Sequence, residues 1–73
     1  MIIKNTGSTV EFYHNDEVIK AIDKDILTFR TDGNNLIECL ESGIATFSIY
    51  FDAVTSPSEA NIIDLFNTLK GYL

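Results

Sequence analysis

Hydrophobic and polar residues alternate along most of this chain. Five stretches show a period of two: residues 9–14, 17–22, 26–31, 36–41 and 44–52. Such alternation is typical of strands that bury one face. Residues 1–4 form a shorter candidate strand at an edge of the sheet. The pattern therefore predicts five or six short strands.

Towards its carboxyl end the chain changes to helical spacing. The apolar residues there form one wide stripe: Ile62, Ile63, Leu65, Phe66 and Leu69. A stripe of this width predicts a helix that covers one face of a sheet. Before it, Ser56 fits an N-cap, Pro57 the first helical position and Glu59 a capping box. Gly71 is expected to end the helix in a left-handed conformation.

The turn residues predict how the first strands pair. Asn15-Asp16 separates two alternating runs, and both residues tolerate the positive φ that a two-residue hairpin loop requires. This loop sets Phe12 opposite Ile19 and Val10 opposite Ala21. All four side chains then share one face, which supports the register.

The loop around Gly33 predicts the next pairing. A two-residue loop would place Phe29 opposite Glu38, whereas a three-residue loop over residues 32–34 places Leu27 and Phe29 opposite Cys39 and Ile37. The second pairing keeps apolar residues together, so it is preferred.

The turn before Ile44 also has a loop length that keeps apolar residues together. A three-residue loop over residues 41–43 gives Gly43 the left-handed position. Cys39 then faces Ala45, and Ile37 faces Phe47.

Together these registers predict a single α+β domain over residues 1–73. It is an antiparallel meander of five or six strands with one C-terminal helix on one face, and curling towards a barrel stays open. The inner face collects twelve positions: Val10, Phe12, Ile19, Ala21, Leu27, Phe29, Ile37, Cys39, Ala45, Phe47, Ile49 and Phe51.

The opposite face is unusually apolar for a surface in contact with water. It carries Tyr13, Val18, Ile22, Ile26, Leu36, Leu40, Ile44 and Tyr50. Ile26, Leu40 and Ile44 are expected to be cross-strand neighbours in one patch. Burying each large side chain is worth about 1.5–3 kcal/mol, so either the sheet curls over this patch or another chain covers it. We favour a protein interface, with seven candidate residues: Ile26, Leu40, Ile44, Leu36, Tyr50, Val18 and Ile22.

Charge and composition exclude several partners. The formal net charge is −6 and there is no basic patch, so binding to nucleic acid is not expected. No apolar run approaches the roughly 18 residues of a membrane span, and the amino end lacks a signal-peptide pattern. Synthesis in the cytoplasm is therefore expected. The single cysteine, Cys39, excludes an internal disulfide and a cysteine-cluster metal site.

No group of residues predicts catalysis. Cys39 is expected in the core, where cysteine behaves as a small hydrophobe, and His14 beside an exposed turn. The acids at Asp16, Glu17, Asp23 and Asp25 lack the spacing of a calcium loop. No phosphate-binding loop, dinucleotide fingerprint or nucleophile elbow is present. We therefore expect no enzyme activity, no metal and no cofactor.

One segment resembles a known family. Residues 51–60 read Phe-Asp-Ala-Val-Thr-Ser-Pro-Ser-Glu-Ala and lead into the spacing Leu65, Leu69, Tyr72-Leu73. This is similar to the carboxyl ends of small bacteriophage virion proteins, in which a hydrophobic strand passes through a Val-Thr-Ser-Pro turn into a short leucine-spaced helix. The resemblance implies a structural or decorating role in a phage particle, with incorporation into the virion, and carries over no catalytic residue.

Two functional hypotheses follow. The first is a non-enzymatic structural or adaptor module that self-associates or docks on a larger protein assembly, for which a virion is one setting. The alternative is an acidic binding or inhibitor module that acts on a basic partner. Salt dependence separates them, because electrostatic attraction to a basic partner weakens as ionic strength rises.

Overall fold

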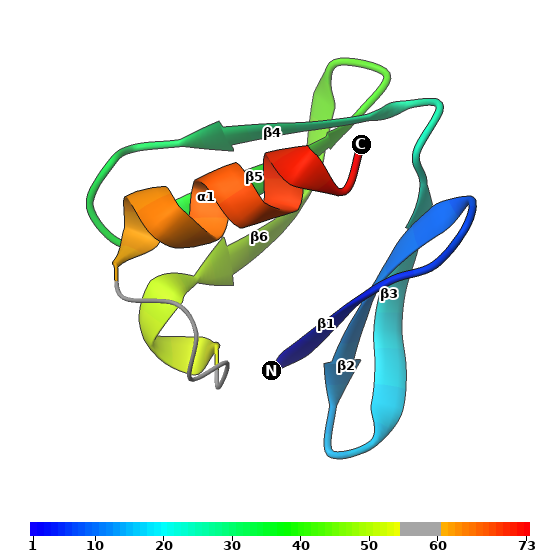
Figure 1. Cartoon of the computed structure of the whole chain (residues 1–73), viewed down its shortest axis with the longest axis horizontal. Helices are drawn as coiled ribbons and strands as arrows, with labels where there is room; N and C mark the ends of the chain where they lie inside the picture. Colours follow the sequence, from blue (N-terminus) through cyan, green and yellow to red (C-terminus); the bar gives the residue numbers. More distant parts are fainter. Residues whose placement is uncertain (55–60) are drawn as a thin grey trace.

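The computed structural model describes residues 1–54 and 61–73 and shows an α+β fold with six strands and one C-terminal α-helix (Figure 1). The six strands form two separate antiparallel sheets of three strands each. The first contains β1 (Ile2–Asn5), β2 (Thr9–His14) and β3 (Glu17–Asp23), and the second contains β4 (Leu27–Thr31), β5 (Leu36–Glu41) and β6 (Ile44–Tyr50). A short 3-10 helix, η1 (Phe51–Ala53), follows β6, and α1 spans Ile62–Gly71.

The single meander sheet expected from the sequence is therefore replaced by two sheets, which do not close into a barrel. The chain passes from the first sheet to the second at residues 24–26. The backbone hydrogen bonds of these residues extend first the β2–β3 pairing and then the β4–β5 pairing. The Lys24 N–H donates to the Ser8 carbonyl beside β2, and the Ser42 N–H donates to the Ile26 carbonyl beside β4, both at 2.9 Å. The chain thus leaves one sheet and enters the other within three residues, so β3 and β4 do not pair.

In the first sheet, the predicted turn is confirmed but the register beyond it is wrong. Asn15 and Asp16 have φ of 50° and 66°, as a two-residue primed turn requires. A β-bulge then inserts Ile19, so that Phe12 pairs with Lys20 and Val10 with Ile22. Because one extra residue reverses which face each side chain occupies, the remaining residues of β3 change sides.

In the second sheet, the loop lengths differ from those expected. Phe29 pairs with Cys39 and Cys39 with Phe47, two residues away from the predicted partners but on the same face. The β5–β6 turn contains only Ser42 and Gly43, with φ of 53° and 84°. A bulge at Thr46 then restores the inward direction of Phe47.

The loop between β4 and β5 is held by a carboxylate. Oδ1 of Asp32 accepts hydrogen bonds from the N–H groups of Asn34, Asn35 and Leu36 at 2.8–3.1 Å. These N–H donors lower the pKa of Asp32, because they stabilise its charged form. The loop is therefore longer than three residues, since it is organised around this side chain.

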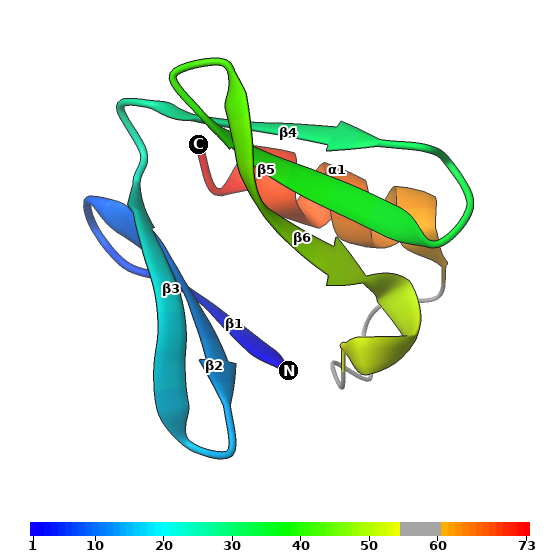
Figure 2. The same cartoon turned by 180° about the vertical axis from the view of Figure 1, so that it is seen from behind.

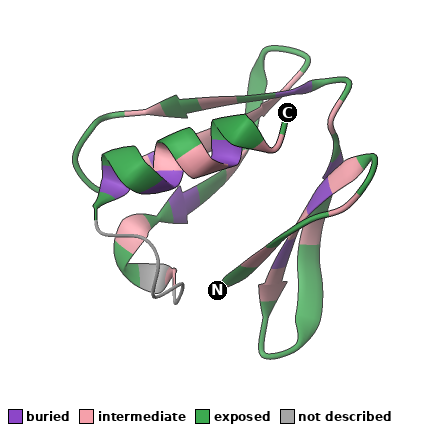
Figure 3. Ribbon diagram, in the orientation of Figure 1, coloured by how far each residue is buried: buried purple, intermediate pink, exposed green. Residues whose placement is uncertain are grey.

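One hydrophobic core joins both sheets and the helix (Figure 3). Its fully or nearly fully buried members are Val10, Phe12, Ile22, Leu27, Ile37, Cys39, Ile49, Ile62, Leu65 and Leu69. The rings of Phe12 and Phe47, one from each sheet, lie 5.0 Å apart between centroids. Phe29, Phe47 and Phe51 pack partly buried against this core, as the sequence predicts. The predicted core positions Ile19, Ala21 and Ala45 are instead exposed, because the two bulges turn them outwards.

Helix α1 packs on the second sheet and buries Ile62, Leu65 and Leu69, whereas Ile63, expected in the stripe, is exposed. Asn61 is the N-cap, and its side-chain oxygen accepts a hydrogen bond from the Asp64 N–H at 3.0 Å. The predicted helix start at residues 56–59 lies outside the described residues. At the other end, the helix includes Gly71, which does not have the positive φ expected of it.

An ion pair also connects the two sheets. Nζ of Lys20 on β3 lies 2.9 Å from Oε2 of Glu41 on β5, and the Thr46 hydroxyl donates to the same carboxylate. Both contacts favour the charged form and so lower the pKa of Glu41. Within residues 1–54 and 61–73, no helix has the length and apolar character needed to cross a membrane.

Candidate functional site

The face of the second sheet that lies opposite α1 is the candidate site. Figure 2 views the molecule from this side, with β5 and β6 in front of the helix. Alternation along the paired strands places nine residues on it: Ile26 at its corner, then Thr28, Arg30, Leu36, Glu38, Leu40, Ala45, Ser48 and Tyr50. We call these nine residues the open face.

The open face contains two apolar groups separated by a polar row. Leu40 lies between Thr28 and Ala45, and Leu36 pairs with Tyr50, which is 56% exposed. Leu36 and Leu40 are half-buried, since β5 is the central strand of this sheet.

The polar row between the two apolar groups is Arg30, Glu38 and Ser48. Nη2 and Nε of Arg30 lie 3.0 and 3.1 Å from Oε1 of Glu38. Arg30 and Glu38 are the only charged residues among the nine, so the open face is neutral although the whole chain carries −6.

Four of the seven predicted interface residues are brought together here: Ile26, Leu36, Leu40 and Tyr50. Ile44 is 67% exposed but pairs with Glu41 instead of Leu40, because the β5–β6 turn has two residues and Thr46 is bulged. By alternation it therefore lies on the side of the sheet that carries Leu27, outside the open face and outside the predicted contiguous patch.

The other two predicted residues lie in the first sheet. Val18 is 52% exposed on β3, where it pairs with Tyr13 on the outer face of that sheet. The assignment of Ile22 to the interface is wrong: its side chain is 1% exposed in the core, because the Ile19 bulge turns it inwards.

Sequence reasoning missed the contribution of Arg30 and Glu38 to the open face. The predicted register placed Thr28 opposite Glu38. A register that paired the two opposite charges across the loop would have matched the observed one, since opposite charges on facing strands attract each other. The opposite charges of Arg30 and Glu38 were therefore the feature of the sequence that could have predicted the β4–β5 register.

Cys39 and His14 are not brought together. Cys39 is buried in the second sheet, and burial, with a smaller contribution from the nearby Glu41 carboxylate, raises the pKa of its thiol to about 12. Such a thiol stays protonated at neutral pH and is a poor nucleophile. His14 is exposed at the end of β2 in the first sheet. The core position expected for Cys39 is confirmed.

The four acids singled out in the sequence do not form one cluster. Asp16 and Glu17 lie at the β2–β3 turn, whereas Asp23 and Asp25 lie at the far end of β3. A strand of this length separates them by about 20 Å. Across the described part of the chain, no group of three His, Cys, Asp or Glu side chains could hold a metal ion.

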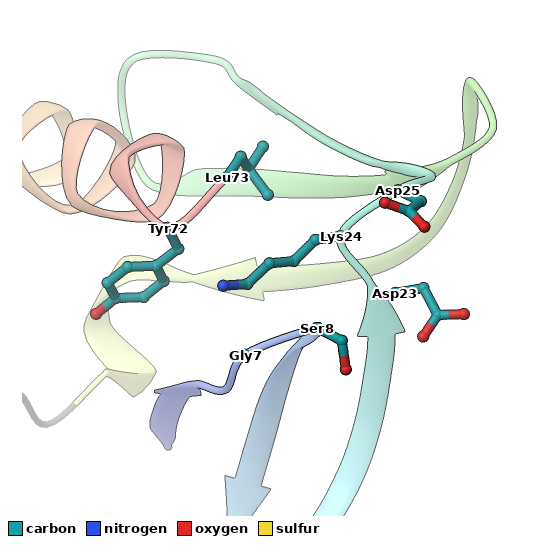
Figure 4. Close-up of a pocket in the computed structure, with 7 residues that line it drawn as sticks. All are labelled: Gly7, Ser8, Asp23, Lys24, Asp25, Tyr72 and Leu73. Carbon is teal, nitrogen blue, oxygen red and sulfur yellow. The ribbon is translucent and has the colours of Figure 1, made fainter.

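A pocket of about 670 Å³ lies where the β1–β2 turn, the link between the sheets and the end of α1 meet. Figure 4 shows its lining: Gly7, Ser8, Asp23, Lys24, Asp25, Tyr72 and Leu73. Lys24 extends towards Tyr72, while the carboxylates of Asp23 and Asp25 point away from both. The side chains of this lining thus supply one ammonium group, two hydroxyl groups and two carboxylates.

Comparison of the chain with protein-family models, curated proteins and solved structures finds no match.

Proposed function

We propose that this chain is a non-enzymatic structural or adaptor module that associates with other protein chains through its open face. The observation that carries the proposal is a neutral, partly apolar sheet face on the side opposite α1. An exposed apolar patch with polar residues among its members is typical of a protein interaction site.

The composition of the open face also suits a protein partner. Interfaces are enriched in tyrosine and arginine and depleted in most other charged residues, and the open face offers one Tyr50 and one Arg30. Leu36 and Leu40 supply apolar area beside them. A partner strand or sheet would cover all four side chains at once.

We place such a module in a larger assembly, and the resemblance of the carboxyl end to small bacteriophage virion proteins suggests a phage particle as that assembly. The resemblance rests on residues 51–60 and on the leucine spacing of α1. The open face lies on the opposite side of the sheet from α1, so both could contribute to one assembly without competing.

The test is to place a charge on the open face. Leu40→Lys and Ile26→Lys are expected to abolish association, because a lysine there would have to be desolvated on binding. The fold should persist in the monomer, since a lysine on this face can extend into water. Light scattering measures the association and circular dichroism the fold.

Val18→Lys is the matched control, because Val18 is an exposed apolar residue on the other sheet. It should leave association unchanged. A monodisperse monomer at high concentration from which no partner is recovered would contradict the proposal, as would Leu40→Lys protein that associates like the wild type.

A further inference from the structure

We infer that the occupant of the open face is a second copy of this chain, stacked sheet on sheet about a two-fold axis. The inference rests on the proposed function and names its partner.

The charge of the open face permits a second copy to stack on it. Two copies with a formal charge of −6 each repel one another in general. The open face is neutral, so stacking two of these faces brings no excess of like charge together. A basic partner would gain nothing from this face, since the acids at Asp16, Glu17, Asp23 and Asp25 lie outside it.

The single ion pair on the face makes it self-complementary. In a dimer with two-fold symmetry, both chains use the same surface. If one residue contacts a second residue of the other chain, the second residue of the first chain also contacts the first residue of the other. With one cation and one anion in the polar row, Arg30 of each copy can approach Glu38 of the other. Such an axis runs parallel to the strands between β4 and β5, so that Leu40 of each copy lies opposite Thr28 of the other.

The size of the face predicts a weak dimer. Strands of five to seven residues at about 3.3 Å per residue, with neighbours about 4.8 Å apart, give a face of about 20 by 14 Å. Interfaces that bury less than about 1,200 Å² in total are generally weak and transient. Measurements therefore have to extend to about 1 mM protein.

A charge-swap experiment tests this inference. Arg30→Glu makes the open face acidic, and Glu38→Arg makes it basic. Each variant alone should dimerise at least tenfold more weakly than wild type, because like charges meet across the two-fold axis. An equimolar mixture of the two should form a one-to-one heterodimer. Sedimentation equilibrium measures all three samples, and Val18→Lys is the control that keeps wild-type dimerisation.

Salt gives an independent readout. Dimerisation of the wild type should strengthen as ionic strength rises, because salt screens the repulsion between two acidic chains. Failure of the mixture to recover dimerisation would overturn the inference, and so would a wild-type chain that stays monomeric up to about 1 mM. Binding of another protein that Leu40→Lys abolishes would still support the proposed function, which separates the two ideas.

Discussion

At the scale of single residues, the fold depends on which isoleucine of β3 points inwards. Ile22 is 1% exposed and Ile19 is 47% exposed, although they lie three residues apart in one strand. Strict alternation would have placed Ile19 and Ala21 inside. The bulge allows the larger Ile22 side chain to enter the core in place of Ala21, which buries more apolar surface.

This pair gives the first prediction. Ile22→Val should lower the free energy of unfolding by about 0.5–1.5 kcal/mol, because it leaves a gap in a packed core. Ile19→Val removes the same methylene from the exposed bulge and should change stability by less than about 0.5 kcal/mol. Urea unfolding of both variants measures the difference. Equal effects, or a larger loss for Ile19→Val, would contradict the observed register.

Residue patterns alone could not predict this outcome. Alternation predicts which face a side chain occupies only while residues of the two strands pair one to one. A bulge inserts an extra residue in one strand, and the hydrophobic pattern alone does not reveal it. The sequence therefore correctly predicted Phe12, Ile37 and Cys39 in the core. These residues lie in β2 and β5, the strands opposite the inserted residues. It misplaced Ile19 and Ala45, which are exposed in strands that contain one.

At the scale of elements, two glycines that look alike in the sequence have different conformations. Gly43 has φ of 84° in the β5–β6 turn, whereas Gly71 lies in the last turn of α1 without a positive φ. A Cβ atom at either position would meet no other atom within 4 Å. Backbone conformation alone should therefore decide how each tolerates alanine.

The second prediction follows from this contrast. Gly43→Ala should destabilise the protein by about 1–2 kcal/mol, because a side chain in the left-handed region is strained. Gly71→Ala should stabilise it by up to about 1 kcal/mol, because alanine restricts the unfolded chain and favours helix. Thermal unfolding of the two variants should move in opposite directions. A loss of stability in Gly71→Ala would indicate a left-handed helix end after all.

The elements themselves were largely predictable. Five alternating runs and one helical run became six strands and a helix, with the short strand at the amino end also confirmed. Turn residues identified Asn15-Asp16 and Gly43 correctly, because few residues accept a positive φ. The loop after Thr31 was longer than expected because Asp32 caps three N–H groups, a role that aspartate often plays and that spacing does not reveal.

At the scale of the whole molecule, the two sheets share one core instead of having one each. Val10, Phe12 and Ile22 of the first sheet belong to the same cluster as the second sheet and α1. A chain of this length buries only about 60% of its unfolded surface, so neither sheet has enough apolar area to be stable alone.

The third prediction is that both sheets unfold together. Tyr13 reports on the first sheet and Tyr50 on the second. With fluorotyrosine in the protein, the native ¹⁹F signals of these two residues should disappear at the same urea concentration, as a two-state transition requires. Loss of the Tyr13 signal at a clearly lower concentration would show that the first sheet opens independently.

The division into two sheets was the feature of the whole molecule that the sequence did not predict. A turn such as Asp23-Lys24-Asp25 could join two paired strands or lead from one sheet to another. The choice depends on the hydrogen bonds of Lys24 and Ile26 to Ser8 and Ser42, which lie elsewhere in the chain. The candidate site was nonetheless partly predicted, since Ile26, Leu36, Leu40 and Tyr50 do share a face.

The short link between the sheets also has a consequence during synthesis. Each sheet is made of consecutive strands, so its own hydrogen bonds can form as soon as its residues leave the ribosome. The residues of the first sheet therefore leave the ribosome before any residue that covers their inner face, so Val10, Phe12 and Ile22 are then in contact with water. Chains that expose apolar surface in this way are prone to aggregate. Slower emergence of residues 24–50 from the ribosome should therefore reduce the soluble yield of this protein.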